Sequence, residues 1–234
     1  FHRVLAIHEP CEMQYVVEFT NGEKVTCHGN HEWTLYSRNA GKTVTIETKE
    51  LAKRSLHSGS MGSRGSRYSY QLESREPLRG CAQQLAVKPY TLGAWLGDGR
   101  NNNPDICGAE EDYAIVEGIV ADGYGITWKC KHKTTGVMYY GFGMGLRGGL
   151  QRYGMCHSKR RTEKHIPDEY LVAPIEDRLE LLAGLLDTDG TLVRDEHRYT
   201  FSTADEELGK GFEALVSTFG WRVSHGVYKP TTSS

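Results

Sequence analysis

The chain has 234 residues, of which 38% are hydrophobic and 25% are charged, and its formal net charge is −2 at pH 7. This length is enough for one large domain or two ordinary ones with a real core. The charge gives no overall basic signature of a nucleic-acid binder, although a basic stripe can exist on a neutral protein. No apolar run approaches the roughly 18 residues needed to span a bilayer, and no signal peptide opens the chain, which argues against membrane contact.

The six cysteines are widely spaced and form no C-x-x-C pair. In a chain of this size, such spacing is typical of reduced, mostly buried thiols rather than of disulfides or zinc ligands. We therefore expect a cytoplasmic protein, or a nuclear one if the source is eukaryotic.

Residues 1–36 have the pattern of β structure. Tyr15–Thr20 and Glu23–Thr26 alternate in character and flank Asn21-Gly22, the strongest short signal for a hairpin. Trp33–Tyr36 predicts a further short strand. This part of the chain is therefore expected to be rich in antiparallel strands.

Residues 55–67 are rich in Ser, Gly and Arg, which predicts a mobile loop or linker and places a domain boundary within 55–88. The pattern then changes to alternating helices and strands, as in an α+β fold. Expected helices cover 90–97, 110–122, 145–152, 175–186 and 205–219, and expected strands cover 126–132, 137–143, 199–203 and 221–228. Asp205 is expected near the N-cap of its helix.

The same apolar-to-acidic segment occurs twice, as Leu92–Gly99 and as Leu182–Gly190. Aligned on their last two residues, Asp98 falls on Asp189. Each copy is a run of helix formers that stops at an acid followed by Gly, the residue preferred just past a helix C-terminus. An acid has the wrong charge for that end of the helix dipole. One such acid could be incidental, but the repetition suggests that two carboxylates meet around a metal cation.

Small residues one helical turn apart, Gly93 with Gly97 and Gly184 with Thr188, predict that the two helices approach closely. Such packing would bring Asp98 and its counterpart together at the paired C-terminal ends. Carboxylate oxygens together with water suit Mg²⁺, and the chemistry that this site favours is hydrolysis of a phosphodiester.

Residues 182–190 resemble the LAGLIDADG signature of homing endonucleases, and residues 92–99 resemble the shorter first motif of intein-borne members, with Leu96 where an acid is lost. Lys164–Pro167 is similar to the family's Lys-x-Ile-Pro segment, and the resemblance covers roughly residues 85–230. It implies a pseudo-two-fold domain of αββαββα units. The second unit is expected to be incomplete, because only residues 191–234 follow the second motif.

The resemblance also implies roles for individual residues. Asp98 and Asp189 would be the catalytic acids that bind the metal, Mg²⁺. Lys164 matches the catalytic lysine, which is thought to polarise water or to stabilise the phosphate; without the resemblance it would pass for an ordinary surface lysine. Asp187 is expected to be supporting and not catalytic.

In this family, long β-ribbons lie in the major groove of double-stranded DNA, so the resemblance implies that outward residues of 126–144 and 191–203 contact DNA. Lys129, Lys131 and Lys133 would share one face of a strand, although a solvated edge protected by lysines is an equal alternative. Further candidates for phosphate contacts are Lys159, Arg160, Arg161, Arg64 and Arg67.

Thr26–Trp33 resembles the B block of the Hint domain, which performs protein splicing. The resemblance implies that His31 bonds to the scissile peptide and promotes an N-to-S acyl shift. His28 stands where Thr or Asn is usual, and a lone His after a strand is more often structural. The opening nucleophile and the closing His-Asn of an intein are absent, so we expect a fragment that does not splice by itself.

We therefore expect an α+β protein with a partial Hint domain at 1–54, a linker and DNA-contact region at 55–88, and a C-terminally truncated LAGLIDADG endonuclease domain at 89–234. The expected activity is a metal-dependent double-strand break at a specific DNA site, within a self-splicing intein. Its partners would be the DNA target and the host protein's exteins, and a monomer is expected. A freestanding homing endonuclease and a non-catalytic DNA- or RNA-binding maturase of the same fold are the alternatives.

Overall fold

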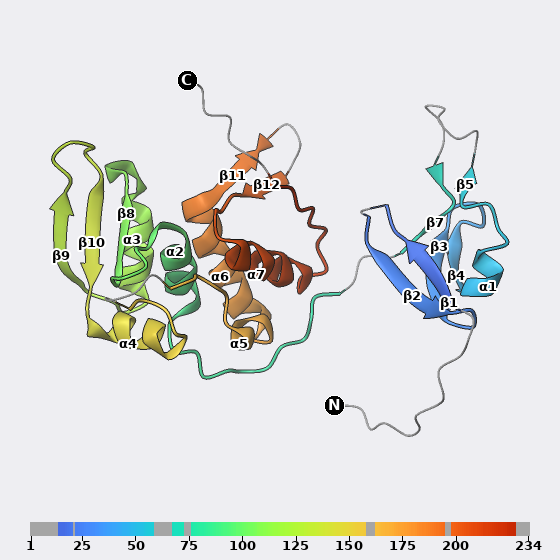
Figure 1. Cartoon of the computed structure of the whole chain (residues 1–234), viewed down its shortest axis with the longest axis horizontal. Coiled ribbons are helices and arrows are strands. Elements are labelled where there is room, and N and C mark those ends of the chain that lie inside the picture. Colours follow the sequence, from blue (N-terminus) through green and yellow to red (C-terminus); the bar gives the residue numbers. More distant parts are fainter. Residues whose placement is uncertain are drawn as a thin grey trace. The chain divides into compact units, whose positions relative to one another are not determined.

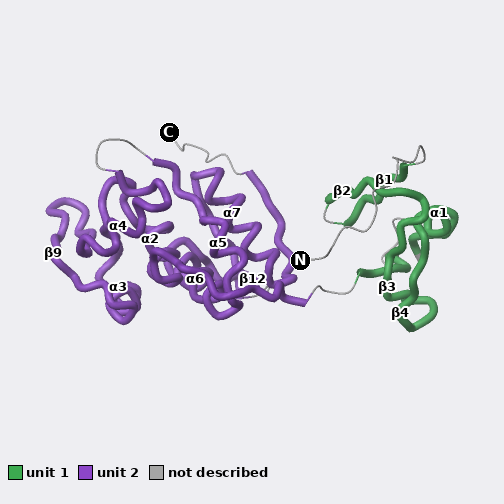
Figure 2. The backbone as a smooth tube through the Cα atoms, turned by 90° about the horizontal axis from the view of Figure 1, so that it is seen from below, with its two compact units in different colours: residues 1–74 green, residues 75–234 purple. Residues whose placement is uncertain are grey.

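The computed structural model describes residues 14–20, 22–58, 67–72, 76–157, 162–194 and 198–227. The chain divides into two compact units, Phe1–Ser74 and Arg75–Ser234 (Figure 2). The mixture of helices and strands agrees with the expected α+β class. Among the described residues, no helix has the length and apolar character needed to cross a bilayer.

Unit 1 begins with the predicted hairpin. Strand β1 (Gln14–Glu18) pairs antiparallel with β2 (Lys24–His28). The connection is closed by a hydrogen bond from the Phe19 amide to the Glu23 carbonyl at 2.8 Å. Gly22 has a φ of +86°, a conformation that glycine adopts without steric cost. The structure therefore confirms the hairpin at the position that the sequence predicts.

A three-stranded sheet forms the rest of unit 1, in the order β4 (Lys42–Glu47), β3 (Glu32–Ser37) and β7 (Tyr70–Gln71). Strand β3 was predicted, and its Trp33 and Leu35 side chains point into a small core. Helix α1 (Thr48–Leu51) follows β4, and a short pair joins β5 (His57–Ser58) to β6 (Arg67–Tyr68). Part of the range expected as linker, 55–88, therefore contributes strands to unit 1.

Unit 2 holds the remaining elements. Within the described residues, its helices are α2 (Pro89–Asp98), α3 (Tyr113–Ala121, preceded by the 3₁₀ turn Glu110–Asp112), α4 (Met144–Arg152), α5 (Asp168–Leu171), α6 (Ile175–Asp189) and α7 (Glu206–Ser217). Its strands are β8 (Asp105–Gly108), β9 (Ile126–Lys131), β10 (Met138–Phe142), β11 (Gly190–Val193) and β12 (Arg198–Phe201). The sheet order is β8-β10-β9, and β11 pairs with β12. Figure 1 shows α2 and α6 in the middle of the unit, with the two sets of strands on either side.

The predicted helices and the pairing of β9 with β10 are confirmed, but helix α5 and strands β4 and β11 were not among the expected elements. Strand β8 was not predicted, because its four residues follow Pro104 and carry too little alternation. The expected strand at 221–228 is wrong for its described part: residues 221–227 pair with no described strand, and the Trp221 ring stacks on Phe219 with ring centres 4.8 Å apart.

The described cysteines are free thiols, as expected, but they are not mostly buried. Cys156 is buried, Cys27 and Cys107 are partly exposed, and Cys81 and Cys130 are exposed. For the cysteines that the structure describes, the wide spacing therefore predicted free thiols correctly and burial incorrectly.

A buried arginine attaches the segment before α2 to the rest of unit 2. Arg178 of α6 is fully buried, and among the described residues no carboxylate forms an ion pair with it. Its guanidinium donates instead to the carbonyls of Ala173 at 3.0 Å, Thr218 at 3.1 Å and Leu78. The end of the expected linker, from residue 76 onward, is thus fixed against α6 and α7.

Helices α2 and α6 touch through their backbones. A Cβ at Gly93 would overlap the Leu181 carbonyl and lie 3.0 Å from the Gly184 Cα, and a Cβ at Gly184 would overlap the Tyr90 carbonyl. A Cβ at Gly97 would overlap the Thr188 side chain. The small residues therefore pack as predicted, with the two helices running in the same direction and their C-terminal ends together.

Enlarging this contact should destabilise unit 2. We expect Gly93→Ala to lower the free energy of unfolding by about 1–3 kcal/mol, because the added methyl must displace backbone atoms. Gly148→Ala is the matched control, since Gly148 lies in α4 with open space around its Cβ position; it should raise stability by about 0.5–1 kcal/mol. Urea unfolding measures both, and equal effects of the two changes would contradict the close helix contact.

Candidate active site

The two aligned acids end the two central helices. Asp98 is the last residue of α2 and Asp189 the last of α6, and both are partly buried. The Asp189 Oδ2 lies 3.3 Å from the position of a Cβ on Gly97, the neighbour of Asp98. Burial and then the negative charge of Asp189 raise the pKa of Asp98 to about 6. The helix contact therefore brings both carboxyl groups into one electrostatic site.

The glycines after the acids have a different role from the expected one. Gly99 and Gly190 have φ values of −73° and −90°, so neither is a left-handed helix cap. A Cβ on Gly99 would overlap the Trp95 carbonyl, and a Cβ on Gly190 would overlap that of Leu186. Glycine is needed because the chain leaves each helix in an extended conformation, close to the last turn.

Lys164 lies at the same helix ends. Its side chain is buried, and its Nζ donates to the carbonyls of Leu96 and Gly97 at 2.9 Å each. The ammonium also lies 5.2 Å from the centre of the Trp95 ring. Its backbone N–H donates to Asp205 Oδ2 at 3.0 Å. The lysine thus satisfies two of the last carbonyls of α2 and places a positive charge at the negative end of the helix.

The charges of this site do not balance. Burial lowers the pKa of Lys164 to about 8, against the opposite influence of Asp189 and Asp98. Burial also raises the pKa of Asp189, against the influence of Lys164. One ammonium beside two carboxylates leaves a net negative charge, so a further cation would stabilise the ionised pair.

The residues present fit Mg²⁺. Asp98 and Asp189 offer hard carboxylate oxygens. The described residues contain no group of three or more His, Cys, Asp or Glu side chains that could hold a metal ion, so a metal at this site would have these two acids as its protein ligands. Mg²⁺ is commonly held by one or two carboxylates and completes its coordination with water and phosphate oxygens. Two acids are therefore sufficient for this ion, whereas a structural zinc site would need four protein ligands.

Tyrosines and an aspartate position the start of α2. The Ala86, Val87 and Lys88 amides donate to the hydroxyls of Tyr153, Tyr170 and Tyr124, respectively. Asp122 Oδ2 accepts from the Thr91 amide at 3.1 Å and from the Thr91 hydroxyl at 2.6 Å. The residue at the N-cap, Lys88, supplies no side-chain cap, so Asp122 does so from the end of α3.

Asp187, the other acid of the second motif, is exposed and accepts a hydrogen bond from the Tyr90 hydroxyl at 2.9 Å. This bond joins α6 to the first turn of α2. Leu96, which aligns with Asp187, is buried in the core. The supporting role of Asp187 stays a prediction.

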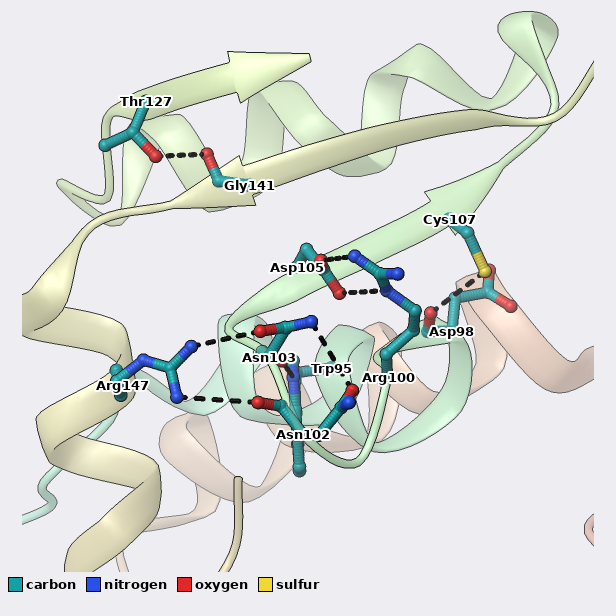
Figure 3. A network of polar contacts seen from close by, with 10 residues as sticks. All are labelled: Trp95, Asp98, Arg100, Asn102, Asn103, Asp105, Cys107, Thr127, Gly141 and Arg147. Carbon is teal, nitrogen blue, oxygen red and sulfur yellow. Dashed lines mark hydrogen bonds and ion pairs between the residues drawn. The ribbon is translucent and has the colours of Figure 1, made fainter. Parts of the chain in front are cut away.

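The sequence did not indicate three polar residues close to Asp98, namely Arg100, Asp105 and Cys107, of which Cys107 contacts it (Figure 3). The Cys107 thiol donates to the Asp98 carbonyl at 3.3 Å, and burial, followed by the Asp98 charge, raises the pKa of Cys107. Arg100 forms a two-point ion pair with Asp105, which is fully buried. The unpredicted strand β8 carries both Asp105 and Cys107, so its omission concealed them.

The predicted lysines of β9 and the turn after it are exposed. Lys131 forms an ion pair with Glu110 at 2.9 Å, between two side chains that are each more than half exposed. Lys129 is in register with Tyr140, whose side chain is buried against the helices. Lys129 and Lys131 therefore lie on the helix side of the sheet, and the opposite side carries Trp128 and Tyr139.

Arg67 lies in β6 of unit 1 and is exposed. The other basic candidates, Arg64, Lys159, Arg160 and Arg161, lie outside the described residues.

The two histidines of the expected B block, His28 and His31, lie where β2 ends and just before β3 begins. The His31 amide donates to the His28 carbonyl at 3.0 Å, and the His31 carbonyl accepts from the Thr48 hydroxyl at 3.0 Å. The exposed His31 ring meets the Trp33 ring edge-on, with centres 4.7 Å apart. The splicing roles of His28 and His31 remain predictions.

Residues 176–224 match the family model of the LAGLIDADG-like domain. The matched stretch runs from α6 through β11 and β12 to beyond α7 and contains Asp189. It supports the homing endonuclease family, whose members are generally nucleases that act on DNA and use divalent metals.

A curated protein, the replicative DNA helicase DnaB of Mycobacterium intracellulare, is 26% identical to this chain over 231 residues. The match covers 91% of this chain and 35% of the helicase. The chain thus spans about a third of the length of the curated relative that it matches.

Removing one carboxylate should stabilise the metal-free protein at neutral pH. The pKa of Asp98 is about 6 in the folded protein and near 4 when unfolded, so the folded state binds more protons between these values. Its contribution is present below pH 4 and is lost as the pH rises through about 6. After discounting for solvent screening, Asp98→Asn should gain roughly 1 kcal/mol at pH 7.5 and little at pH 4.

Urea unfolding in EDTA at both pH values measures this effect. Glu117→Gln, on the exposed side of α3, is the control and should change little at either pH. A loss of stability in Asp98→Asn at pH 7.5 would contradict the repulsion between the two acids.

Proposed function

We propose that this chain is part of a homing endonuclease that makes a metal-dependent double-strand break at a specific DNA site. The observation that carries the proposal is the convergence of Asp98 and Asp189 at the paired ends of α2 and α6, with Lys164 beside them. A helix-packing motif alone needs the glycines but not two partly buried acids that repel each other. Metal-dependent hydrolysis of a phosphodiester explains both acids, because both carboxylates would hold the metal ion.

In this proposal Asp98 and Asp189 hold Mg²⁺, which when bound supplies positive charge to neutralise the scissile phosphate. The close contact between α2 and α6 sets the positions of the two carboxylates relative to each other. Lys164 is anchored on the carbonyls of Leu96 and Gly97, from where its ammonium can donate to an oxygen that gains charge during hydrolysis.

We further propose that the endonuclease lies within an intein. The support is the resemblance of Thr26–Trp33 to the splicing B block and the similarity to a DnaB helicase along most of this chain. The host would then be a replicative helicase, with its exteins as partners. On this view residues 1–54 are part of a Hint domain, and residues 89–234 are a pseudo-two-fold LAGLIDADG domain of a monomer, with 55–88 between them.

Two alternatives make different predictions. A freestanding endonuclease would use unit 1 as an accessory DNA-binding module and would not splice. A maturase of the same fold would bind DNA or RNA without cutting, and the presence of both Asp98 and Asp189 argues against it.

Replacing either acid should abolish cleavage. In the full-length protein that carries this chain, we expect Asp98→Asn and Asp189→Asn to cut DNA at least 100-fold more slowly, with DNA affinity largely unchanged, because affinity comes from distributed phosphate contacts. Lys164→Ala should reduce the rate less completely. The substrate is a plasmid with the uninterrupted helicase gene, and nicking and linearisation are followed over time in Mg²⁺.

Asp187→Asn is the matched control, because Asp187 belongs to the same motif but is bonded to Tyr90. It should retain most of the cleavage activity. Full cleavage by both Asp98→Asn and Asp189→Asn would mean that the repeated motif serves only helix packing, and it would contradict the proposed enzyme activity.

The splicing proposal has a separate test. His31→Ala should slow release of the N-terminal extein from the full-length precursor, because the scissile peptide loses its hydrogen-bond partner, and should leave DNA cleavage unchanged. His57→Ala, in β5 of the same unit, is the control. Gel analysis of precursor and products measures both, and unimpaired splicing of the His31 variant would contradict the B-block role.

A further inference from the structure

A buried carboxylate holds an exposed guanidinium next to the candidate active site. Arg100 follows Asp98 by two residues, and its Nε donates to Asp105 Oδ1 at 2.9 Å while its Nη2 donates to Asp105 Oδ2 (Figure 3). The Asp105 side chain is 0% exposed, whereas that of Arg100 is 42% exposed. The backbone amide of Arg100 donates to the Asp105 carbonyl at 3.3 Å as well. One edge of the guanidinium is thus held by Asp105, while the side chain as a whole stays partly exposed.

Aromatic rings restrict the guanidinium further. Its centre lies 4.9 Å from the centre of the Tyr139 ring and 6.0 Å from that of Trp128. Gly141 of β10 lies opposite Asp105 of β8 on one side and opposite Trp128 of β9 on the other. The Trp128 ring lies where a side chain on Gly141 would be. This group lies on the side of the sheet opposite the buried Tyr140. A planar guanidinium beside aromatic rings loses little further freedom when it binds a partner.

The pairing with Asp105 leaves a complete hydrogen-bonding fork. It uses Nε and one hydrogen of Nη2, so that Nη1 and the second hydrogen of Nη2 remain. Among the described residues, no acceptor bonds to Nη1 of Arg100. Two parallel donors of this kind match the O6 and N7 acceptors of guanine in the major groove.

Charge favours a guanine over a phosphate as the partner. The Asp105 carboxylate compensates the charge of Arg100, and a compensated arginine gains little from a phosphate, whose attraction depends on net positive charge. A fixed fork is what recognition of a base edge requires. Arg147 provides the contrast: it donates to the Asn102 carbonyl and to Asn103 Oδ1, with no carboxylate partner among the described residues, and keeps its full charge.

We propose that Arg100, positioned by Asp105, recognises one guanine in the major groove close to the bond that is cut. The inference rests on the proposed endonuclease function, because it requires DNA on this side of the sheet. Arg100 would be a specificity-determining residue, and Asp105 a positioning residue that acts through it.

The test is selection of bound duplexes from a randomised DNA library, followed by affinity measurements over a range of salt concentrations. The proteins are the full-length protein that carries this chain and its variants Arg100→Gln, Arg100→Lys, Asp105→Asn and Arg147→Gln, together with the double variant Arg100→Gln/Asp105→Asn, which keeps a buried amide pair in place of the ion pair. The duplexes selected by the wild-type protein should share one guanine near the centre of the site. The duplexes selected by Arg100→Gln, by Arg100→Lys and by the double variant should lack this preference.

At that base pair the preference for guanine should fall about 10- to 100-fold, with other positions unchanged. The salt dependence of the double variant should stay that of the wild type, because replacing both Arg100 and Asp105 leaves the net charge of the pair unchanged. Asp105→Asn should weaken the preference and strengthen binding to all sequences, since it frees a positive charge. Arg147→Gln should retain the guanine.

Several results would overturn the inference. An equal loss of affinity for all sequences in the double variant, with the slope of log affinity against log salt concentration reduced by about one, would make Arg100 a phosphate contact. Recovery of the guanine in the double variant would make the ion pair purely structural, and loss of the guanine in Arg147→Gln would assign it elsewhere. A wild-type protein that selects a sequence whose guanines are unaffected by Arg100→Gln refutes this inference alone, whereas a wild-type protein that selects no sequence refutes the proposed function with it.

Discussion

The backbone contact between α2 and α6 is the constraint on which the rest of unit 2 depends. Gly93 and Gly184 lie where any side chain would overlap the opposite helix, so the distance between the helices is set by their main chains and not by adaptable side chains. The register of this contact determines where each helix ends relative to the other. Because both helices end in an aspartate, the same contact determines the geometry of the candidate active site.

The electrostatics of the site follow from that geometry. Two helices that end together place two negative dipole ends and two carboxylates in a partly buried space, which is unfavourable in the absence of a cation. Lys164 relieves part of this repulsion by bonding to the last carbonyls of α2, and Asp205 holds its backbone. The remaining negative charge is the physical reason to expect a divalent ion. The proposed phosphodiester chemistry would account for a site that lowers stability in this way.

Much of this arrangement could be predicted from the sequence, because the glycines and acids repeat at a fixed spacing. The hairpin of unit 1, the helices of unit 2 and the N-cap at Asp205 also followed from local signals. The burial of Lys164 could not be predicted from composition, since its acceptors lie on a helix that is distant in sequence. Strand β8 was missed because it is short, and with it the partner of Arg100. The strand expected at 221–227 fails because alternation predicts a strand only where a neighbour is available to pair with it.

The most direct test of the account is Mn²⁺ binding in place of Mg²⁺, measured by electron paramagnetic resonance on the wild-type protein and on the Asp98→Asn and Asp189→Asn variants. A single position shared by the two carboxylates predicts one class of bound ion between them that either substitution alone removes. Binding that survives in both variants, or that is lost in parts that add up independently, would show that the two acids do not form one metal site and would contradict the central claim.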